Sequence, residues 1–187
     1  MLFNTIFHPT SAFEKAFFKP DNKKSLLVVS LAGLFLALAI FILTFNTVYS
    51  IFAFITNFLN WIIFSVILFF FEFVHARKKT KAAENGFRKA LSVVGTIWEI
   101  NMVAYVAIIV GVLVILRLSG FMQTLAVGAL FILLILLAFI WLIASFKMLK
   151  VVFKAKRWKL ILNWVILMIL NSVIASIISR FLTTLIF

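Results

Sequence analysis

Five apolar stretches, each long enough to cross a lipid bilayer as a helix, make up most of this chain. They cover residues 25–46, 51–74, 92–116, 124–147 and 160–183. The hydrocarbon core of a bilayer is about 30 Å thick, and about 20 helical residues cross it at a rise of about 1.5 Å per residue. The pattern therefore predicts an integral membrane protein.

The composition agrees with a chain surrounded by lipid. Apolar residues make up 66% of the sequence and charged residues 12%, whereas a soluble domain carries about 25% charged residues. We therefore expect an all-α polytopic membrane helical bundle with five transmembrane helices and a short N-terminal amphipathic interfacial helix. Residues 1–24 form the expected cytoplasmic amphipathic segment, and residues 25–187 the five-helix transmembrane domain, with no soluble domain appended.

The basic residues are concentrated in three regions of the chain. Of the 18 lysines and arginines, 15 lie before the first apolar stretch, between the second and third, or between the fourth and fifth, and Lys147 is the last residue of the fourth stretch. This alternation is typical of the positive-inside rule, and it predicts a cytoplasmic N-terminus and an external C-terminus. We expect a multi-pass protein of a prokaryotic plasma membrane.

The basic connections have two interpretations. They set the topology and lie near anionic lipid headgroups, or they bind an acidic soluble partner; the first is expected of any multi-pass protein. The candidate contact residues for anionic lipid or a partner are Arg77, Lys78, Lys79, Lys81, Arg88, Lys89, Lys154, Lys156 and Arg157.

The N-terminal segment is rich in phenylalanine. Phe13 and Phe17 lie four residues apart, on one face of a predicted short helix that ends before Pro20. Ser11 and Glu14 have the spacing of a capping box at the start of that helix. The helix lies in the headgroup region or packs as an ordinary short helix under the bundle.

Three polar residues are candidates for chemistry in or near the membrane: Glu72, Glu99 and Asn101. An ionisable group within a span is a functional hypothesis because its charge is expensive to bury. The segment 86–100 is either an interfacial amphipathic lead or the first half of a long, tilted span. The polar neighbours of Glu99 and the adjacent Trp98 favour an interfacial depth for this carboxylate.

Small and polar residues predict where the helices pack. Gly33 and Gly111 each belong to a pair of small residues four apart, a spacing that permits close helix approach. The fifth stretch carries a polar stripe that is expected to face protein and not lipid. The stripe consists of Asn171, Ser172, Ser176, Ser179 and Thr183.

The motifs of common enzymes are missing from the sequence. It has no cysteine, no two-histidine zinc motif, no nucleophile elbow and no glycine-rich phosphate loop. We therefore expect no enzymatic activity, no cofactor, no bound metal and no nucleic-acid partner. The expected partners are membrane lipids with anionic cytoplasmic headgroups; another membrane protein or a second copy of the chain is a further candidate.

The order of these features resembles the Yip (Ypt-interacting protein) family of five-pass membrane proteins, in its prokaryotic branch. The resemblance begins at His8-Pro9-Thr10 and continues through the two phenylalanines to a second motif, Asn-Gly-Phe-Arg-Lys-Ala-Leu at residues 85–91. Gly95 is followed by Thr96 with no proline after it, which departs from the family pattern. The resemblance implies a five-pass fold and a membrane-organising role, without a GTPase partner or a catalytic residue.

These observations lead to two functional hypotheses. The first is a non-enzymatic, Yip-like protein that acts as a membrane-organising or interaction scaffold. The alternative is a small transporter or channel that uses Glu99 and the polar stripe of the fifth helix. The lack of proline inside any span and the odd number of spans disfavour a transporter with paired, broken helices.

Overall fold

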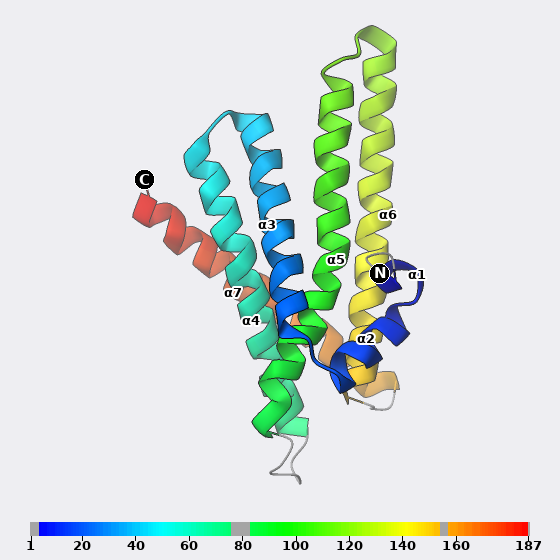
Figure 1. The fold of residues 1–187 in the computed structure, drawn as a ribbon, viewed down its shortest axis with the longest axis vertical. Helices are drawn as coiled ribbons and strands as arrows, with labels where there is room; N and C mark the ends of the chain where they lie inside the picture. The colour runs from blue at the N-terminus through cyan, green and yellow to red at the C-terminus, as the bar shows by residue number, and fades with distance from the viewer. Residues whose placement is uncertain (1–3, 76–82, 154–156, 187) are drawn as a thin grey trace.

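The chain is built from α-helices throughout the part that the structure describes. The computed structural model describes residues 4–75, 83–153 and 157–186, without the side chains of 4, 73–75, 83–85, 157, 175, 178, 179, 181–183, 185 and 186. The helices are α1 (Asn4–Phe7), α2 (Pro9–Phe18), α3 (Asn22–Thr44), α4 (Thr47–His75), α5 (Ala83–Ile115), α6 (Gly120–Phe153) and α7 (Arg157–Ile186) (Figure 1).

Four of these helices are long and apolar enough to cross a membrane. They are α3, α4, α5 and α6, and the described part of α7 adds a shorter apolar helix at Trp158–Ile174. The chain is thus a multi-pass helical membrane protein with at least four candidate spans. Most of the helices are longer than the apolar stretches predicted for them. Polar residues near an interface can continue a helix beyond the point where the sequence stops being apolar.

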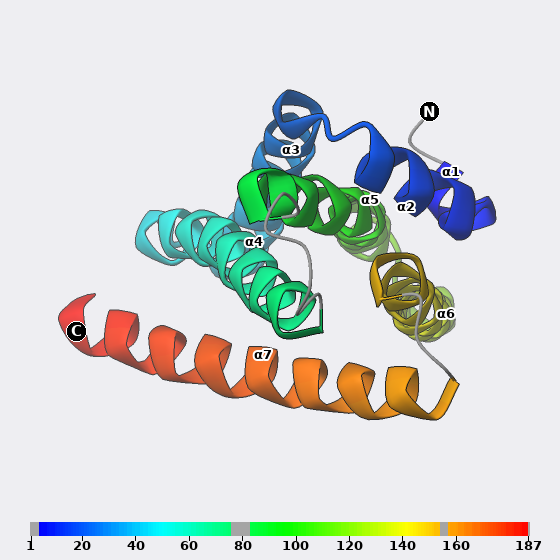
Figure 2. The same cartoon turned by 90° about the horizontal axis from the view of Figure 1, so that it is seen from below.

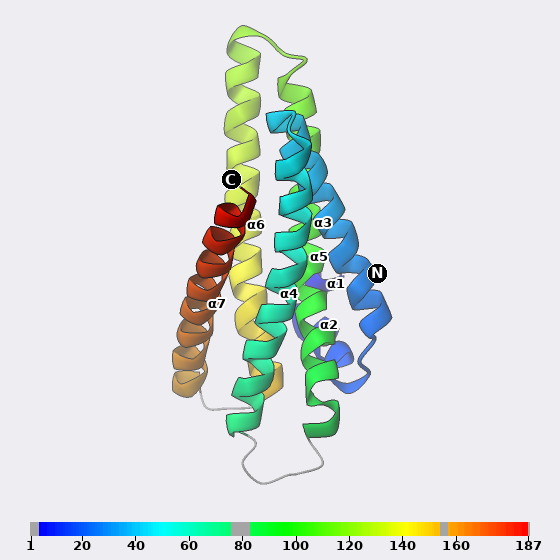
Figure 3. The ribbon, with the colours of Figure 1, turned by 90° about the vertical axis from the view of Figure 1, so that its left-hand side faces the viewer.

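The four long helices α3 to α6 run roughly parallel, and α7 crosses them obliquely (Figures 1 and 3). Seen along the bundle, the four appear nearly end-on while α7 lies broadside across α4 and α6 (Figure 2). Among the described residues, α5 packs against every other helix except α7, which packs against α4 and α6. Every residue from 92 to 100 is buried, which agrees with the central position of α5.

The ambiguous segment 86–100 is the first half of one long helix. α5 is continuous over 33 residues, from Ala83 to Ile115, so the helix begins nine residues before the apolar stretch that starts at residue 92. Its first turns pack against α4, where a side chain added at Gly86 would meet the Phe69 ring at 3.0 Å. Contacts with α4 thus stabilise the helical conformation of this basic, amphipathic segment at the start of α5.

The turn between α3 and α4 is shorter than the gap between the first two apolar stretches, which end at residue 46 and begin at residue 51. Phe45 ends α3 in a left-handed conformation (φ 51°), and α4 begins at Thr47. The side chain of Asn46 accepts hydrogen bonds from the backbone N–H groups of Val48 (2.9 Å) and Tyr49 (3.3 Å). This asparagine therefore satisfies donors that the first turn of a helix leaves free.

The N-terminal segment forms two short helices that pack on the side of the bundle against α5 and α6 (Figure 1). Phe13 is completely buried and Ala16 is nearly so. The predicted capping box is wrong: the helix begins at Pro9, with His8 at the N-cap position and no side-chain cap. Proline sets the start because its missing N–H is not needed in the first turn.

Two predicted close approaches are confirmed, and the structure adds a third. A side chain at Gly33 would meet the Phe54 ring at 3.0 Å, and one at Gly111 would meet Leu130 at 2.7 Å. Gly95 of α5 is more tightly confined, because a Cβ there would overlap the Cβ of Ser25 and lie 3.0 Å from its Cα. Helices α3 and α5 therefore cross almost backbone to backbone at this point.

A polar network lies in the core between α3, α4 and α5. Asn57 of α4 donates from Nδ2 to the backbone carbonyl of Val29 (3.1 Å), and its Oδ1 accepts from Trp98 Nε1 (3.1 Å). Trp61 donates to the carbonyl of Leu91 at 3.2 Å. Each polar group finds a partner from a different helix, so these contacts set how the three helices are rotated against one another.

Candidate functional site at Glu99

The carboxylate of Glu99 lies inside the protein, with 1% of the residue exposed. Its Oε1 accepts from Lys24 Nζ at 2.5 Å, and its Oε2 accepts from the hydroxyl of Thr5 at 2.5 Å. Thr5 is also 1% exposed, whereas the side chain of Lys24 is 46% exposed. The carboxylate is therefore enclosed by the protein but paired with a lysine that reaches the protein surface.

Local contacts at the start of α3 position Lys24. Asp21 is the N-cap of this helix and accepts from the backbone N–H of Lys24 at 3.0 Å. The backbone N–H of Asp21 donates to Ser92 Oγ of α5 (3.1 Å), and Ser25 Oγ lies 3.3 Å from the Ser92 carbonyl. The close crossing at Gly95 is next to these bonds, so the lysine and the carboxylate come from helices that are locked together.

Thr5 reaches Glu99 because α1 and α2 are held on the bundle by apolar packing. Phe13 and Ala16 of α2 are buried in the core. Lys89 of α5 lies over the Phe17 ring, 5.0 Å from its centroid, in a cation–π arrangement. The hydroxyl of Thr5 adds a polar contact to this apolar packing. It donates to the carboxylate of Glu99, and a hydrogen bond to a charged acceptor is strong.

This arrangement neutralises a charge and joins three segments. Both carboxylate oxygens of Glu99 have donors from other parts of the chain, 75 and 94 residues away. Among the described residues, no group of three or more histidine, aspartate or glutamate side chains can hold a metal ion. The chemistry available is a charged, three-way connection between α1, α3 and α5.

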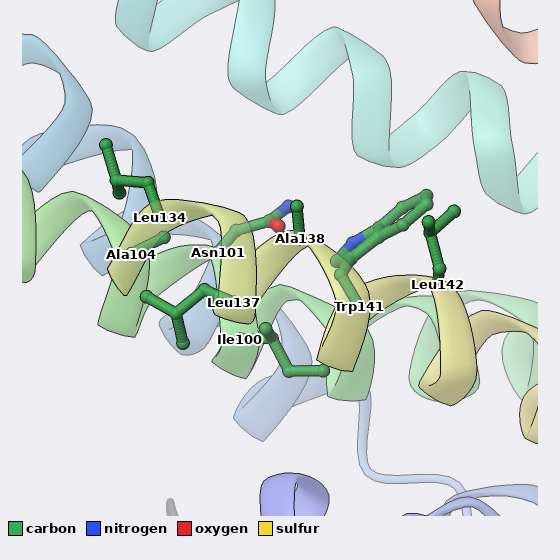
Figure 4. Close-up of a pocket in the computed structure, with 8 residues that line it drawn as sticks. All are labelled: Ile100, Asn101, Ala104, Leu134, Leu137, Ala138, Trp141 and Leu142. Atoms are coloured by element: carbon green, nitrogen blue, oxygen red, sulfur yellow. The ribbon is translucent and has the colours of Figure 1, made fainter. Parts of the chain in front are cut away.

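Asn101, two residues after Glu99, faces a different environment. It lines a groove of about 380 Å³ between α5 and α6, beside Trp141 (Figure 4). The other lining residues are Ile100, Ala104, Leu134, Leu137, Ala138 and Leu142. The groove is thus apolar apart from one carboxamide and one indole N–H.

The remaining predicted contact residues are spread over the structure. Glu72 is half-buried near the end of α4, Arg88 is exposed on α5, and Lys89 is partly buried against Phe17. Arg157 begins α7, but its side chain lies outside the described part. The other basic candidates lie outside the described residues: Arg77, Lys78, Lys79, Lys81, Lys154 and Lys156.

The polar stripe of α7 is not its packing face where its side chains are described. Ser172 and Ser176 are exposed, so the prediction that they pack against the other helices of this chain is wrong. Leu160 and Leu167 are buried instead, and Trp164 donates to Ser145 of α6 at 2.8 Å. Asn171 is half-buried; the side chains of Ser179 and Thr183 lie outside the described part.

The sequence interpretation of Glu99 missed both of its partners. The sequence favours an interfacial depth for Glu99, and the structure shows that its carboxylate is enclosed by protein. Lys24 was recognised only as a topology signal, and Thr5 was not singled out. A single threonine in a short segment carries no local pattern, so only the packing of α1 identifies it.

The comparisons with known proteins do not assign this site. No protein-family model, curated protein or solved structure matches the chain.

Proposed function

We propose that this protein is a non-enzymatic scaffold of the membrane that presents its N-terminal helices to a partner. The observation that carries the proposal is the pairing of Glu99 with Thr5 and Lys24. A transport pathway requires a water-filled cavity or a chain of titratable groups across the membrane, whereas Glu99 is bonded to one titratable group, Lys24, and one hydroxyl. The carboxylate here is used to attach α1 and α3 to α5, which favours an interaction role over transport.

The proposed contact surface is the outer face of α1 and α2. Phe7 and Phe18 are 71% and 63% exposed, and Lys15 and Lys19 are exposed beside them. Large exposed aromatic rings flanked by lysines suit either anionic headgroups or a membrane protein with an acidic surface. The attachment through Thr5 holds these rings in a fixed position on the bundle.

The family assignment and the number of spans belong to the same proposal. A Yip-like protein would cross the membrane five times, with α7 as a tilted fifth span. The starts of α3, α5 and α7 and the last turns of α6 carry lysines and arginines, which supports a cytoplasmic location for this end of the bundle. The membrane would be the plasma membrane of a prokaryote.

A reporter fused after Phe187 tests the fifth span. We expect the fusion to be active only when the reporter works outside the cytoplasm, because five crossings place the two termini on opposite sides. The measurement is a paired assay with one reporter active outside and one active in the cytoplasm. A reporter active only in the cytoplasm would mean that α7 lies along the membrane and does not cross it.

Isolation of complexes from native membranes tests the scaffold itself. We expect proteins that co-purify with the full chain to be lost when Phe18 is replaced by alanine and kept in a matched variant, Phe121→Ala. Phe121 is also highly exposed, at 76%, but begins α6 at the other end of the bundle. Ion or proton flux in reconstituted vesicles that Glu99→Gln abolishes would contradict the scaffold and support a transporter.

A further inference from the structure

We propose that the groove between α5 and α6 binds one acyl chain of a membrane glycerolipid, with the ester carbonyl of that chain at Asn101. This site goes beyond the scaffold function and requires only that α5 and α6 cross the bilayer. Both helices have the length and apolar composition for this. The volume of about 380 Å³ lies at the lower end of the range of about 300–1,000 Å³ typical of ligand pockets.

The groove has a polar end and an apolar end. In Figure 4, Leu134 and Ala104 lie at one end and Trp141 and Leu142 at the other, with Asn101 between them beside Ala138; both polar groups are thus away from the Leu134 end. α5 and α6 run antiparallel (Figure 1). Residues that follow Asn101 on α5 and residues that precede Trp141 on α6 therefore lie toward the same end of the bundle. An amphiphile with one polar group and a hydrocarbon chain matches this order.

The lining residues exclude several other classes of ligand. None of the described residues that line the groove is charged, so an ion, a nucleotide or a free fatty-acid carboxylate would have no counter-charge from them. The indole N–H of Trp141 is buried and has no hydrogen-bond partner in the described structure. A neutral acceptor next to Asn101 would give this donor a partner once the ring turns toward it.

The position of the polar end in the membrane identifies the acceptor as a lipid ester. Trp141 lies six residues before Lys147, or about 9 Å along α6. A lysine near a helix end extends its ammonium to the headgroup region, so Asn101 and Trp141 lie just inside it. Ester carbonyls of glycerolipids lie at this depth, and the chain then follows Leu137, Ala138 and Leu134 into the hydrocarbon core.

The test reconstitutes the full chain into phosphatidylcholine vesicles that contain a small fraction of phosphatidylcholine with a photoactivatable group on its acyl chain. We expect crosslinks to concentrate on residues 134–142. Ala138→Leu fills the groove and should reduce this crosslinking about tenfold. Trp141→Phe keeps the ring but removes the N–H, and loss of one hydrogen bond should reduce crosslinking about fivefold.

Gly128→Leu is the matched control for added volume on the same helix. A side chain at Gly128 meets nothing within 4 Å, so it enlarges the lipid-facing surface without entering the groove. Crosslinking at residues 134–142 should be unchanged in this variant. Equal crosslinking in Ala138→Leu and Gly128→Leu, or label spread evenly along α6, would overturn the proposal; circular dichroism of each variant shows whether it has folded.

Discussion

Replacing Gly95 with alanine is expected to destabilise the bundle more than any alanine placed on an open helix surface. The new Cβ would overlap Ser25 and lie 3.0 Å from its Cα, so the backbone of α3 must move. Overpacking of this kind typically costs about 1–3 kcal/mol. The shift would also strain the bonds from Asp21 and Ser25 to Ser92, which lie at the same crossing.

Gly128→Ala provides the comparison, since it adds the same methyl group to α6 with nothing within 4 Å. Alanine is favoured over glycine in a helix by about 1 kcal/mol, so this variant should be as stable as the parent or more so. Thermal unfolding of both variants in the same detergent measures the difference. Equal unfolding temperatures would show that α3 and α5 can separate at this crossing without loss of stability.

The membrane-spanning part of the fold was largely predictable because a bilayer imposes a minimum apolar length. Four predicted stretches correspond to α3, α4, α5 and α6, and the fifth falls within α7. Hydropathy carries no information about how helices cross, so the oblique course of α7 was not anticipated (Figure 2). The same limit applies to its polar stripe, which the described serines place on an exposed face.

Helix ends and close contacts were only partly predictable. The capping-box pattern at Ser11 predicts a helix that starts there, whereas a proline favours the first turn of a helix. In the structure α2 begins at Pro9. Gly33 and Gly111 were recognised from the spacing of small residues. Gly95 has no small residue four positions away, and its contact is with a serine at the start of another helix.

The candidate site shows why a polar residue in an apolar chain is easier to find than its partners. Glu99 is conspicuous because acidic residues are scarce in this sequence, at 5 of 187. Its donors lie 75 and 94 residues away, on segments whose own sequence patterns indicate a topology signal and a short helix. Sequence alone identifies the acidic residue, and three-dimensional packing identifies both its burial and the groups that neutralise it.

Removing the Thr5 hydroxyl is expected to loosen the N-terminal helices from the bundle. Thr5→Val keeps the shape of the side chain but takes one donor from a buried carboxylate. A hydrogen bond to a charged group contributes about 1.5–3 kcal/mol. Because the chain has no cysteine, Ala16→Cys introduces a single thiol on the buried face of α2. A water-soluble maleimide should react with this thiol about 10- to 100-fold faster in Thr5→Val.

Thr96→Val distinguishes loss of this contact from a general effect of removing a hydroxyl. Thr96 is also buried, but its hydroxyl donates to the Ser92 carbonyl within α5 at 2.9 Å. The labelling rate of the Ala16 thiol should therefore stay at the parent value in this variant. Glu99→Leu should accelerate labelling as much as Thr5→Val, and combining the two should add little, because both remove the same bond. If Thr96→Val and Thr5→Val gave equal rates, apolar packing of Phe13 alone would hold α1 and α2, and Glu99 would need another role.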